Sequence, residues 1–223
     1  MTLLCLDTSH SQGSLCLSRD SQILELHTWT QEKSHAELVA GYIAKTFSNH
    51  KLKQTDIDAY VVNIGPGSFT GIRISINTIK TLSFVTKKPI YTFNSLETLA
   101  ESCSLDDENL FVAINAHSDL CYSARFVRSD SSWTLKDNVE VIPSTKLNDV
   151  LVEPKTVFAG DAFTIYKDKI TVPIRRPNVF LDTPSAKHLS TLALKQSSKT
   201  VSWENLNPFY VRLSSPEEKI LKK

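Results

Sequence analysis

The stretch Gly65-Pro66-Gly67-Ser68-Phe69-Thr70-Gly71-Ile72-Arg73 decides the fold of this chain, because it joins an apolar strand to a long helix through glycines. Residues 59–64 before it form a mostly apolar run that predicts a buried strand. Residues 70–86 after it carry isoleucines at helical spacing, and Lys87-Lys88-Pro89 is typical of a helix end. A glycine loop between a strand and a helix suits an anion or the close approach of another backbone.

The glycine loop fits neither of the common nucleotide-binding motifs. A P-loop requires Gly-Lys-Ser/Thr after four intervening residues, and no such lysine follows here. A dinucleotide fingerprint requires a third glycine where this chain has Thr70, with Gly71 one position late. A tight turn that only glycine can adopt is therefore the alternative to an anion site.

Length and composition are those of a globular protein. The chain has 223 residues, of which 41% are hydrophobic and 22% charged, enough for one or two domains. A net charge of +1 argues against an extensive electrostatic footprint for nucleic acid. The four cysteines form no Cys-x-x-Cys pair, which argues against a zinc or redox motif. With Asp7 where a signal peptide is apolar and no long apolar run, we expect a cytoplasmic protein without a membrane segment.

The order of predicted elements occurs twice along the chain. The first half predicts strands at 3–6, 15–17, 23–28, 59–64 and 89–93, with helices at 34–48, 70–86 and from Asn94 or Ser95 to 103. The second half predicts strands at 110–116, 121–127, 133–136 and 157–159, and helices at 144–151 and from Thr183-Pro184 to about 195. The polar residues 104–109 separate the halves. We therefore predict two similar mixed-sheet α/β lobes, 1–104 and 105–223, the second ending in a polar tail at 214–223.

The first long helix begins at a predicted capping box, Ser34-His35-Ala36-Glu37, and carries small residues along one side. These are Ala36, Ala40, Gly41 and Ala44. Small side chains let another element approach closely. Two interpretations follow: the small residues face this protein's own sheet, or they dock a partner helix. Thr70 is the predicted cap of the second long helix.

Residues with reactive side chains form no recognisable catalytic set. The six histidines lack ligand spacing, and His35 is expected to be solvated at the helix start. Ser9 and Ser68 lack a Gly-x-Ser-x-Gly elbow, so a peptidase has no visible nucleophile–base pair. Glu97 and Glu101 predict a surface pair rather than a metal site. The sequence thus predicts no catalytic residue and no metal ligand.

Four stretches give the chain a family resemblance. They are Leu6-Asp7-Thr8-Ser9, Gly65 through Arg73, Ile114-Asn115-Ala116 and Pro208-Phe209-Tyr210-Val211-Arg212, of which the second is the specific one. With them the chain resembles the actin-like (ASKHA, RNase H-like) architecture of sugar kinases, Hsp70 and actin. Within that architecture it is similar to the TsaB (YeaZ) family of the glycoprotease-like group.

The resemblance implies a non-catalytic partner protein. Its partner would be a TsaD-like threonylcarbamoyl transferase, which makes N6-threonylcarbamoyladenosine (t6A) beside the anticodon of tRNAs that read codons starting with A. A small TsaE-like ATPase would join them, and a homodimer would form without the partner. The resemblance implies no cofactor in the isolated chain, with ATP or ADP and Mg at the interface of the assembled complex, and tRNA contact through the complex.

The resemblance also implies a pairing surface made by the first two long helices. The residues that match it are Ala36, Ala40, Gly41 and Ala44 of the first helix, with Gly65, Gly67, Ser68, Phe69, Thr70, Gly71 and Arg73 of the loop and second helix. On this interpretation, the small side chains and the glycines let a partner backbone come close. Arg73 stands in the first turn, where the helix dipole disfavours a cation, and so it either meets a partner carboxylate or phosphate or lies along the surface.

Two departures from the family pattern weigh on the chemistry. Catalytic relatives bind metal through a His-x-x-x-His helix, where this chain has Asn94-Ser95-Leu96-Glu97-Thr98. The second-half turn, often Asp-Ala-Arg, is Asn115-Ala116-His117 here, which leaves its role open. One alternative is an independent actin-like ATPase or phosphotransferase in which Asp7, Thr8 and Ser9 hold a metal-bound phosphate, although Asp7 also suits a local turn. The other is a metallopeptidase-like hydrolase.

Overall fold

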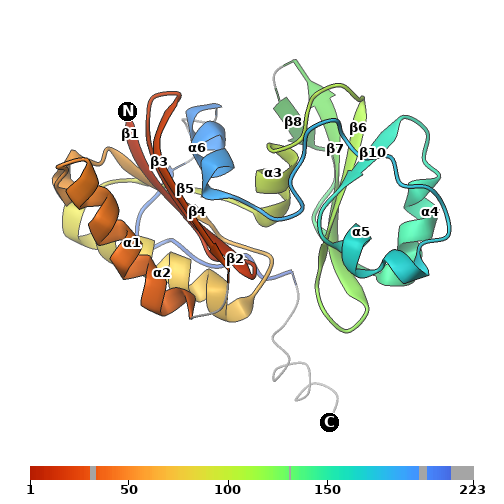
Figure 1. The fold of residues 1–223 in the computed structure, drawn as a ribbon, viewed down its shortest axis with the longest axis horizontal. Coiled ribbons are helices and arrows are strands. Elements are labelled where there is room, and N and C mark those ends of the chain that lie inside the picture. Colours follow the sequence, from red (N-terminus) through yellow and green to blue (C-terminus); the bar gives the residue numbers. More distant parts are fainter. Residues whose placement is uncertain (31–33, 131, 196–199, 212–223) are drawn as a thin grey trace, which may run out of the picture.

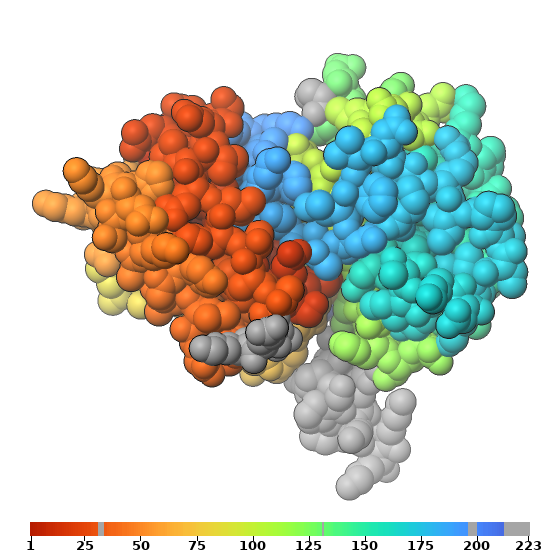
Figure 2. Space-filling view, viewed as in Figure 1, coloured from red at the N-terminus to blue at the C-terminus, as the bar shows by residue number. Residues whose placement is uncertain are grey.

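A computed structural model describes residues 1–30, 34–130, 132–195 and 200–211 of the chain (Figure 1). Two mixed sheets form two lobes that lie side by side. Figure 2 shows the N-terminal residues in red and orange on one side, the green and cyan residues on the other, and a blue segment between them. In the part of the chain that the structure describes, no helix is long and apolar enough to cross a membrane.

The two sheets share the order of four strands and differ outside it. In the first, β1 (Thr2–Asp7), β2 (Gln12–Arg19) and β3 (Gln22–Thr30) are antiparallel neighbours, and β4 (Ala59–Asn63) and β5 (Ile90–Phe93) continue parallel to β1. In the second, β6 (Asn109–Asn115), β7 (Leu120–Ser129) and β8 (Ser132–Leu135) are antiparallel, and β10 (Thr156–Ala159) is parallel to β6. A short strand, β9 (Glu140–Pro143), pairs with β7. The predicted pair of mixed-sheet α/β lobes is therefore confirmed.

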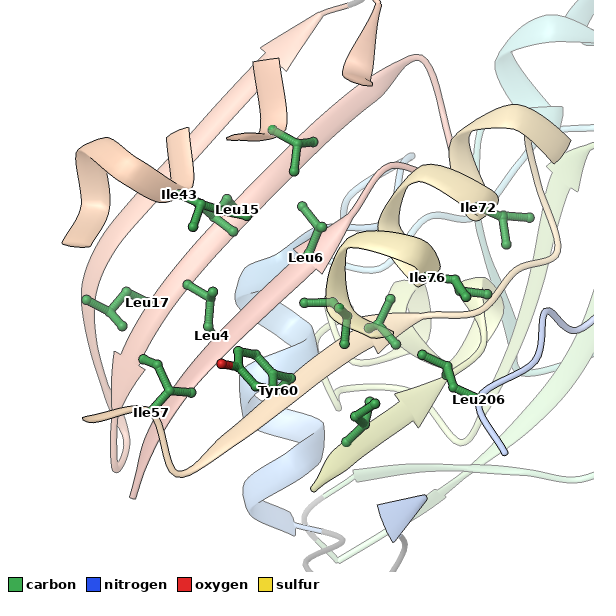
Figure 3. Close-up of a cluster of buried hydrophobic side chains, with 14 of the residues drawn as sticks. Leu4, Leu6, Leu15, Leu17, Ile43, Ile57, Tyr60, Ile72, Ile76 and Leu206 are labelled. Carbon is green, nitrogen blue, oxygen red and sulfur yellow. The ribbon is translucent and has the colours of Figure 1, made fainter. Parts of the chain in front are cut away.

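Three helices cover the first sheet, on both of its faces. The helices α1 (His35–Asn49) and α2 (Phe69–Thr86) lie side by side on one face, and α6 (Ala186–Lys195) covers the other (Figure 1). Alternate residues of β1 serve the two faces, since Leu4 and Leu6 pack with the α1–α2 side while Leu3 and Cys5 pack with the α6 side. Figure 3 shows side chains from β1, β2 and both helices meeting in the first of these clusters.

Shorter helices accompany the second sheet. They are α3 (Ser95–Ala100), which follows β5 and packs against β6, α4 (Leu147–Leu151) and α5 (Ala162–Ile165). Single 3₁₀ turns occur at Gln54–Asp56, Ser144–Lys146 and Lys167–Lys169.

The chain returns to the first lobe near its end. After residues 170–185, α6 packs on β1, β2 and β4, and β11 (Thr200–Val201) pairs with β5. Leu206 then joins the core beneath α2 (Figure 3). Residues 186–195 and 200–211 thus pack on the N-terminal sheet and its helices, so a boundary at 104/105 does not describe which residues share a sheet.

Helix starts differ in detail from the predictions. Ser34 caps α1, but its hydroxyl accepts from the Ala36 N–H at 3.3 Å while the Glu37 N–H bonds to the Ser34 carbonyl, so the predicted capping box is wrong. The cap of α2 is Ser68, whose hydroxyl accepts from the Gly71 N–H at 3.2 Å, and not Thr70. Because α2 begins at Phe69, the capping position is Ser68, and Thr70 already lies inside the helix.

Two further predictions need correction. The helix α6 begins at Ala186, so Pro184 precedes it rather than standing in its first turn. Glu97 and Glu101 do not form a surface pair: Glu97 caps α3 by accepting from the Asn94 N–H, and the mostly buried Glu101 carboxylate pairs with Lys195 at 2.6 Å. The predicted polar tail at 214–223 lies outside the described residues.

Candidate functional site

A groove with a volume of about 620 Å³ runs along the surface between α1 and α2. None of the described residues that line it is charged. They are Ala36, Val39, Ala40, Ile43, Ala44 and Phe47 from α1, Gln54 from the following turn, and Ile74, Asn77, Thr78, Thr81 and Leu82 from α2. A concave, mostly apolar surface of this kind suits a protein partner better than a charged ligand.

The small residues of α1 face solvent rather than the sheet. Ala36, Ala40 and Ala44 are exposed and line the groove, whereas Val39 and Ile43 occupy the face that packs on the sheet. Gly41 is also exposed, and a Cβ there would meet nothing within 4 Å. The interpretation that these small residues face this protein's own sheet is therefore wrong.

The glycines of the loop accommodate the turn between β1 and β2. A Cβ on Gly67 would lie 2.3 Å from the Ser9 carbonyl oxygen, and one on Gly71 would lie 1.8 Å from that of Thr8. Gly65 has a φ of +106°, which favours glycine. The close backbone approach predicted from the sequence occurs, but the approaching backbone belongs to the same chain, and Gly65 and Gly71 are buried.

The exposed part of the loop presents a cation. Ser68, Thr70 and Arg73 are exposed. The Arg73 guanidinium lies 3.8 Å from the centre of the Phe69 ring, and its Nε donates to the Tyr210 hydroxyl at 3.2 Å. Among the residues that the structure describes, no carboxylate pairs with Arg73, so its charge is available to an approaching group.

Asp7, Thr8 and Ser9 lie beneath this loop in a buried polar network. Asp7 Oδ1 accepts from the Ser9 N–H and Asp7 Oδ2 from Asn63 Nδ2, both at 2.8 Å. Asn63 Oδ1 in turn accepts from the Gly65 N–H at 2.9 Å. Since Asp7, Thr8 and Ser9 are each at most 1% exposed and both Asp7 oxygens are used within the chain, this geometry does not fit a metal-bound phosphate.

Three of the loop amides donate to groups within the chain. The Ser68 N–H donates to the Ser9 carbonyl at 2.7 Å, the Gly71 N–H to the Ser68 hydroxyl, and the Gly65 N–H to Asn63. A phosphate-binding loop needs such groups free and pointing at the anion. The loop therefore acts as a structural turn in this chain.

The second lobe has a corresponding turn after β6. Asn115 Oδ1 accepts from the His117 N–H at 2.9 Å and from the Tyr166 hydroxyl at 2.8 Å. His117, Ser118 and Asp119 are exposed and have φ angles of 59°, 52° and 61°. This turn presents the side chains of residues 117–119 to solvent.

A smaller cleft of about 280 Å³ lies between the lobes. Its lining includes Ser9 and His10 from the first lobe and Asn115 and Asp161 from the second. Burial lowers the pKa of His10, and the Asp161 and Asp7 carboxylates oppose that shift. Burial likewise raises the pKa of Asp161, and His10 opposes it. The His10 imidazole and the Asp161 carboxylate thus line the same cleft, and each opposes the effect of burial on the pKa of the other.

His35 is not the solvated residue that the sequence predicts. It is only 2% exposed, its Nδ1 accepts from Trp29 Nε1 at 2.9 Å, and its Nε2 donates to the His10 carbonyl at 2.8 Å. The partners stand 6 and 25 residues earlier in the chain, so no local pattern could reveal this contact.

The stretch 94–98, compared in the sequence analysis with a His-x-x-x-His helix, holds a helix cap. Asn94 and Thr98 stand one turn apart, and the Thr98 hydroxyl donates to the Asn94 carbonyl at 2.8 Å. Within the described ranges, no three or more His, Cys, Asp or Glu side chains are arranged to hold a metal.

Comparisons with known proteins agree with this architecture. The family model of TsaD, tRNA N6-adenosine threonylcarbamoyltransferase, matches residues 22–167, more than half of the chain. The tRNA threonylcarbamoyladenosine biosynthesis protein TsaB of Buchnera aphidicola subsp. Schizaphis graminum is 26% identical over 88% of this chain and 95% of that protein. TsaB of Bacillus subtilis is 24% identical over 98% and 97%. The solved structure of YeaZ from Pseudomonas aeruginosa superposes with a TM-score of 0.79 at 25% identity, over 94% of this chain and 100% of that one. The chain therefore belongs to the family that the TsaD model describes and, within it, to the TsaB (YeaZ) group.

Proposed function

We propose that this protein is a non-catalytic partner of a TsaD-type tRNA threonylcarbamoyltransferase and is required for t6A formation on tRNA. Its relatives over nearly the full length are named as tRNA threonylcarbamoyladenosine biosynthesis proteins. The observation that carries the proposal is the exposed groove between α1 and α2, which has no charged lining among the described residues. In a member of this family, such a surface is best explained as the binding site of another subunit.

The polar side chains of the first lobe support a non-catalytic role. Asp7 and Ser9 are buried in hydrogen bonds within the chain, and His35 is held between Trp29 and His10. A nucleophile or general base must reach its substrate, and these groups do not reach solvent. The chemistry of t6A formation is assigned to the catalytic subunit.

The docking model uses the exposed residues of both helices. The partner places a helix against Ala36, Ala40 and Ala44, whose small side chains permit a close approach. Gly41 borders this contact on α1, and Ser68, Phe69 and Thr70 border it at the start of α2. Arg73 receives a carboxylate or phosphate of the partner at the end of the groove. Gly65, Gly67 and Gly71 act indirectly, because they shape the loop.

The wider assembly follows from the same surface. In the absence of the catalytic subunit, a second copy of this chain occupies the groove and forms a homodimer. A TsaE-like ATPase joins the complex in the cytoplasm, and ATP or ADP with Mg binds at an interface between subunits rather than in this chain alone. With 25 basic and 24 acidic residues the chain lacks a strong positive field, so tRNA is held mainly by the catalytic subunit.

The test compares two arginine substitutions on α1. Ala40→Arg places a charge in the groove, and Ser48→Arg places the same side chain at an exposed position of α1 that does not line it. Burying an unpaired charge at an interface costs several kcal/mol, so Ala40→Arg should weaken binding of the catalytic subunit about 100-fold, and Ser48→Arg less than about twofold. Calorimetric titration measures both, with thermal unfolding as the folding control. Equal affinities for the wild-type and Ala40→Arg proteins would reject the docking surface.

A further inference from the structure

Two consecutive carbonyl groups in the β1–β2 turn hold the starts of the two groove helices. The Ser9 carbonyl accepts from the N–H of Ser68, the cap of α2, at 2.7 Å. The His10 carbonyl accepts from Nε2 of His35, the first residue of α1, at 2.8 Å. Because the groove lies between α1 and α2, this turn sets the separation of the two helices at one end of the groove.

Only one protonation state of His35 satisfies both of its partners. The Trp29 indole can only donate, so His35 Nδ1 must accept from it. The His10 carbonyl can only accept, so His35 Nε2 must carry the proton. With 2% of the residue exposed, water does not replace either bond easily. His35 is therefore a fixed link between the turn and α1.

Two residues of the same turn border the cleft between the lobes. His10 and Ser9 line that cleft, and His10 Nδ1 lies 3.0 Å from the Ser9 hydroxyl. The buried His10 Nε2 has no hydrogen-bond partner among the described residues. Asp161 of the second lobe lines the same cleft and is held by the Asn115 N–H at 2.8 Å. A change in the position of Asp161 relative to His10 thus acts on the turn that holds both helices.

We propose that His10 and His35 are positioning residues that couple the interlobe cleft to the docking groove. The His10 ring senses Asp161 across the cleft, its carbonyl holds His35, and His35 fixes the start of α1. The proposal rests on the proposed function in one respect, namely that the groove binds the catalytic subunit. Affinity at the groove then depends on residues that the partner does not touch.

Two substitutions of His35 separate its two bonds. His35→Gln retains a side-chain N–H near the position of Nε2 and keeps the bond to the His10 carbonyl, but loses the acceptor for Trp29. His35→Asn retains an acceptor near the position of Nδ1 and keeps the Trp29 bond, but loses the link to His10. We expect affinity for the catalytic subunit to fall about tenfold in His35→Asn and less than about twofold in His35→Gln. Thermal unfolding of both variants is measured alongside.

A substitution in the other lobe tests the coupling without touching α1. Asp161→Asn keeps an oxygen for the Asn115 N–H and removes the charge that faces His10. We expect about a threefold loss of affinity and faster amide hydrogen exchange in the first turns of α1 and α2 of the isolated chain. Asp149→Asn, which changes an exposed carboxylate of the same lobe that pairs with Lys146, is the control and should alter neither.

The outcomes distinguish this proposal from the proposed function. If the wild-type chain does not bind the catalytic subunit, the proposed function fails, and hydrogen exchange in the isolated chain still tests the coupling. If the wild-type chain binds, equal affinities for His35→Asn and His35→Gln overturn the positioning role. Unchanged hydrogen exchange in Asp161→Asn overturns the coupling in either case.

Discussion

Both lobes end their first strand in the same kind of turn, but only the first lobe covers that turn with a long helix. Asp7 accepts from the N–H two residues later at 2.8 Å, and Asn115 does the same at 2.9 Å. In the first lobe Asp7, Thr8 and Ser9 are buried beneath the start of α2, which has 18 residues. In the second lobe the helix after β10 is α5, with 4 residues, and the turn is exposed.

Close packing of a glycine against a backbone carbonyl occurs in both lobes, at the β1–β2 turn in the first lobe and within β6 in the second. A Cβ on Gly160 would lie 2.1 Å from the Ala113 carbonyl oxygen, much as one on Gly71 would lie 1.8 Å from that of Thr8. Among the described residues, the long helices α1, α2 and α6 all lie on the first sheet. We infer that the turn has only a structural role in the second lobe, whereas in the first lobe it also positions the helices of the docking groove.

The largest expected effect tests the close packing itself. Gly71→Ala forces a Cβ onto a backbone oxygen and should lower the free energy of unfolding by about 3 kcal/mol or more. Gly41→Ala, in the open on α1, should raise it by about 0.5–1 kcal/mol because alanine favours helix. Urea unfolding measures both. If Gly71→Ala lowers the free energy of unfolding by less than about 1 kcal/mol, the turn can shift to accommodate a Cβ, and close packing no longer explains the glycine.

The next effect concerns α6, which packs on the first sheet only. Burial, with a smaller contribution from Lys187, lowers the pKa of His188 from 6.5 to about 4. As the pH falls, His188 therefore binds a proton in the unfolded chain before it does so in the folded one. The free energy of unfolding is at its full value above about pH 6.5 and falls by up to about 3 kcal/mol as the pH decreases toward 4. Urea unfolding of the wild-type protein and His188→Gln at pH 7 and pH 5 measures this.

His188→Gln should lose less stability in acid than the wild-type protein does. It should not become independent of pH, because burial also lowers the pKa of His10 and acts in the same direction. Identical losses in both proteins would mean that His188 is protonated without disturbing α6.

The smallest effect compares the two turns directly. In Asp7→Asn the new amide group faces Asn63 Nδ2, so two donors oppose each other in a buried site, at a cost of about 2 kcal/mol. In Asn115→Asp the acceptor for the His117 N–H and the Tyr166 hydroxyl is kept in a less buried turn, and the cost should stay below about 1 kcal/mol. Equal costs, measured by urea unfolding, would remove the distinction between a covered and an uncovered turn.

The sequence predicts the longer elements because each of them carries a local signal. Isoleucines at helical spacing predict α2, and alternating or continuous apolar runs predict the longer strands of both sheets. The sequence does not predict the short elements β9, α5 and β11. The return of α6 and β11 to the first sheet has no such signal, because sequence order does not state which sheet a late element joins. The choice of Ser68 over Thr70 as a cap is likewise decided by the path of the loop.

The candidate site is only partly visible in the sequence. The small residues Ala36, Ala40 and Ala44 are recognisable, but the face they occupy depends on Val39 and Ile43, which take the side toward the sheet. The glycines predict the close approach of another backbone, but the sequence does not show which backbone it is. The burial of His35 depends on a carbonyl 25 residues away, so only the folded chain reveals it.

The most direct test of the account is a titration of t6A formation by the catalytic subunit with increasing amounts of this chain, wild type or Ala40→Arg. Modification should depend on the wild-type chain and saturate with it. Ala40→Arg should reach the same plateau at about 100-fold higher concentration, because it weakens docking and leaves the chemistry to the other subunit. Superimposable curves, or full modification without this chain, would contradict the claim that the groove between α1 and α2 is where this protein acts.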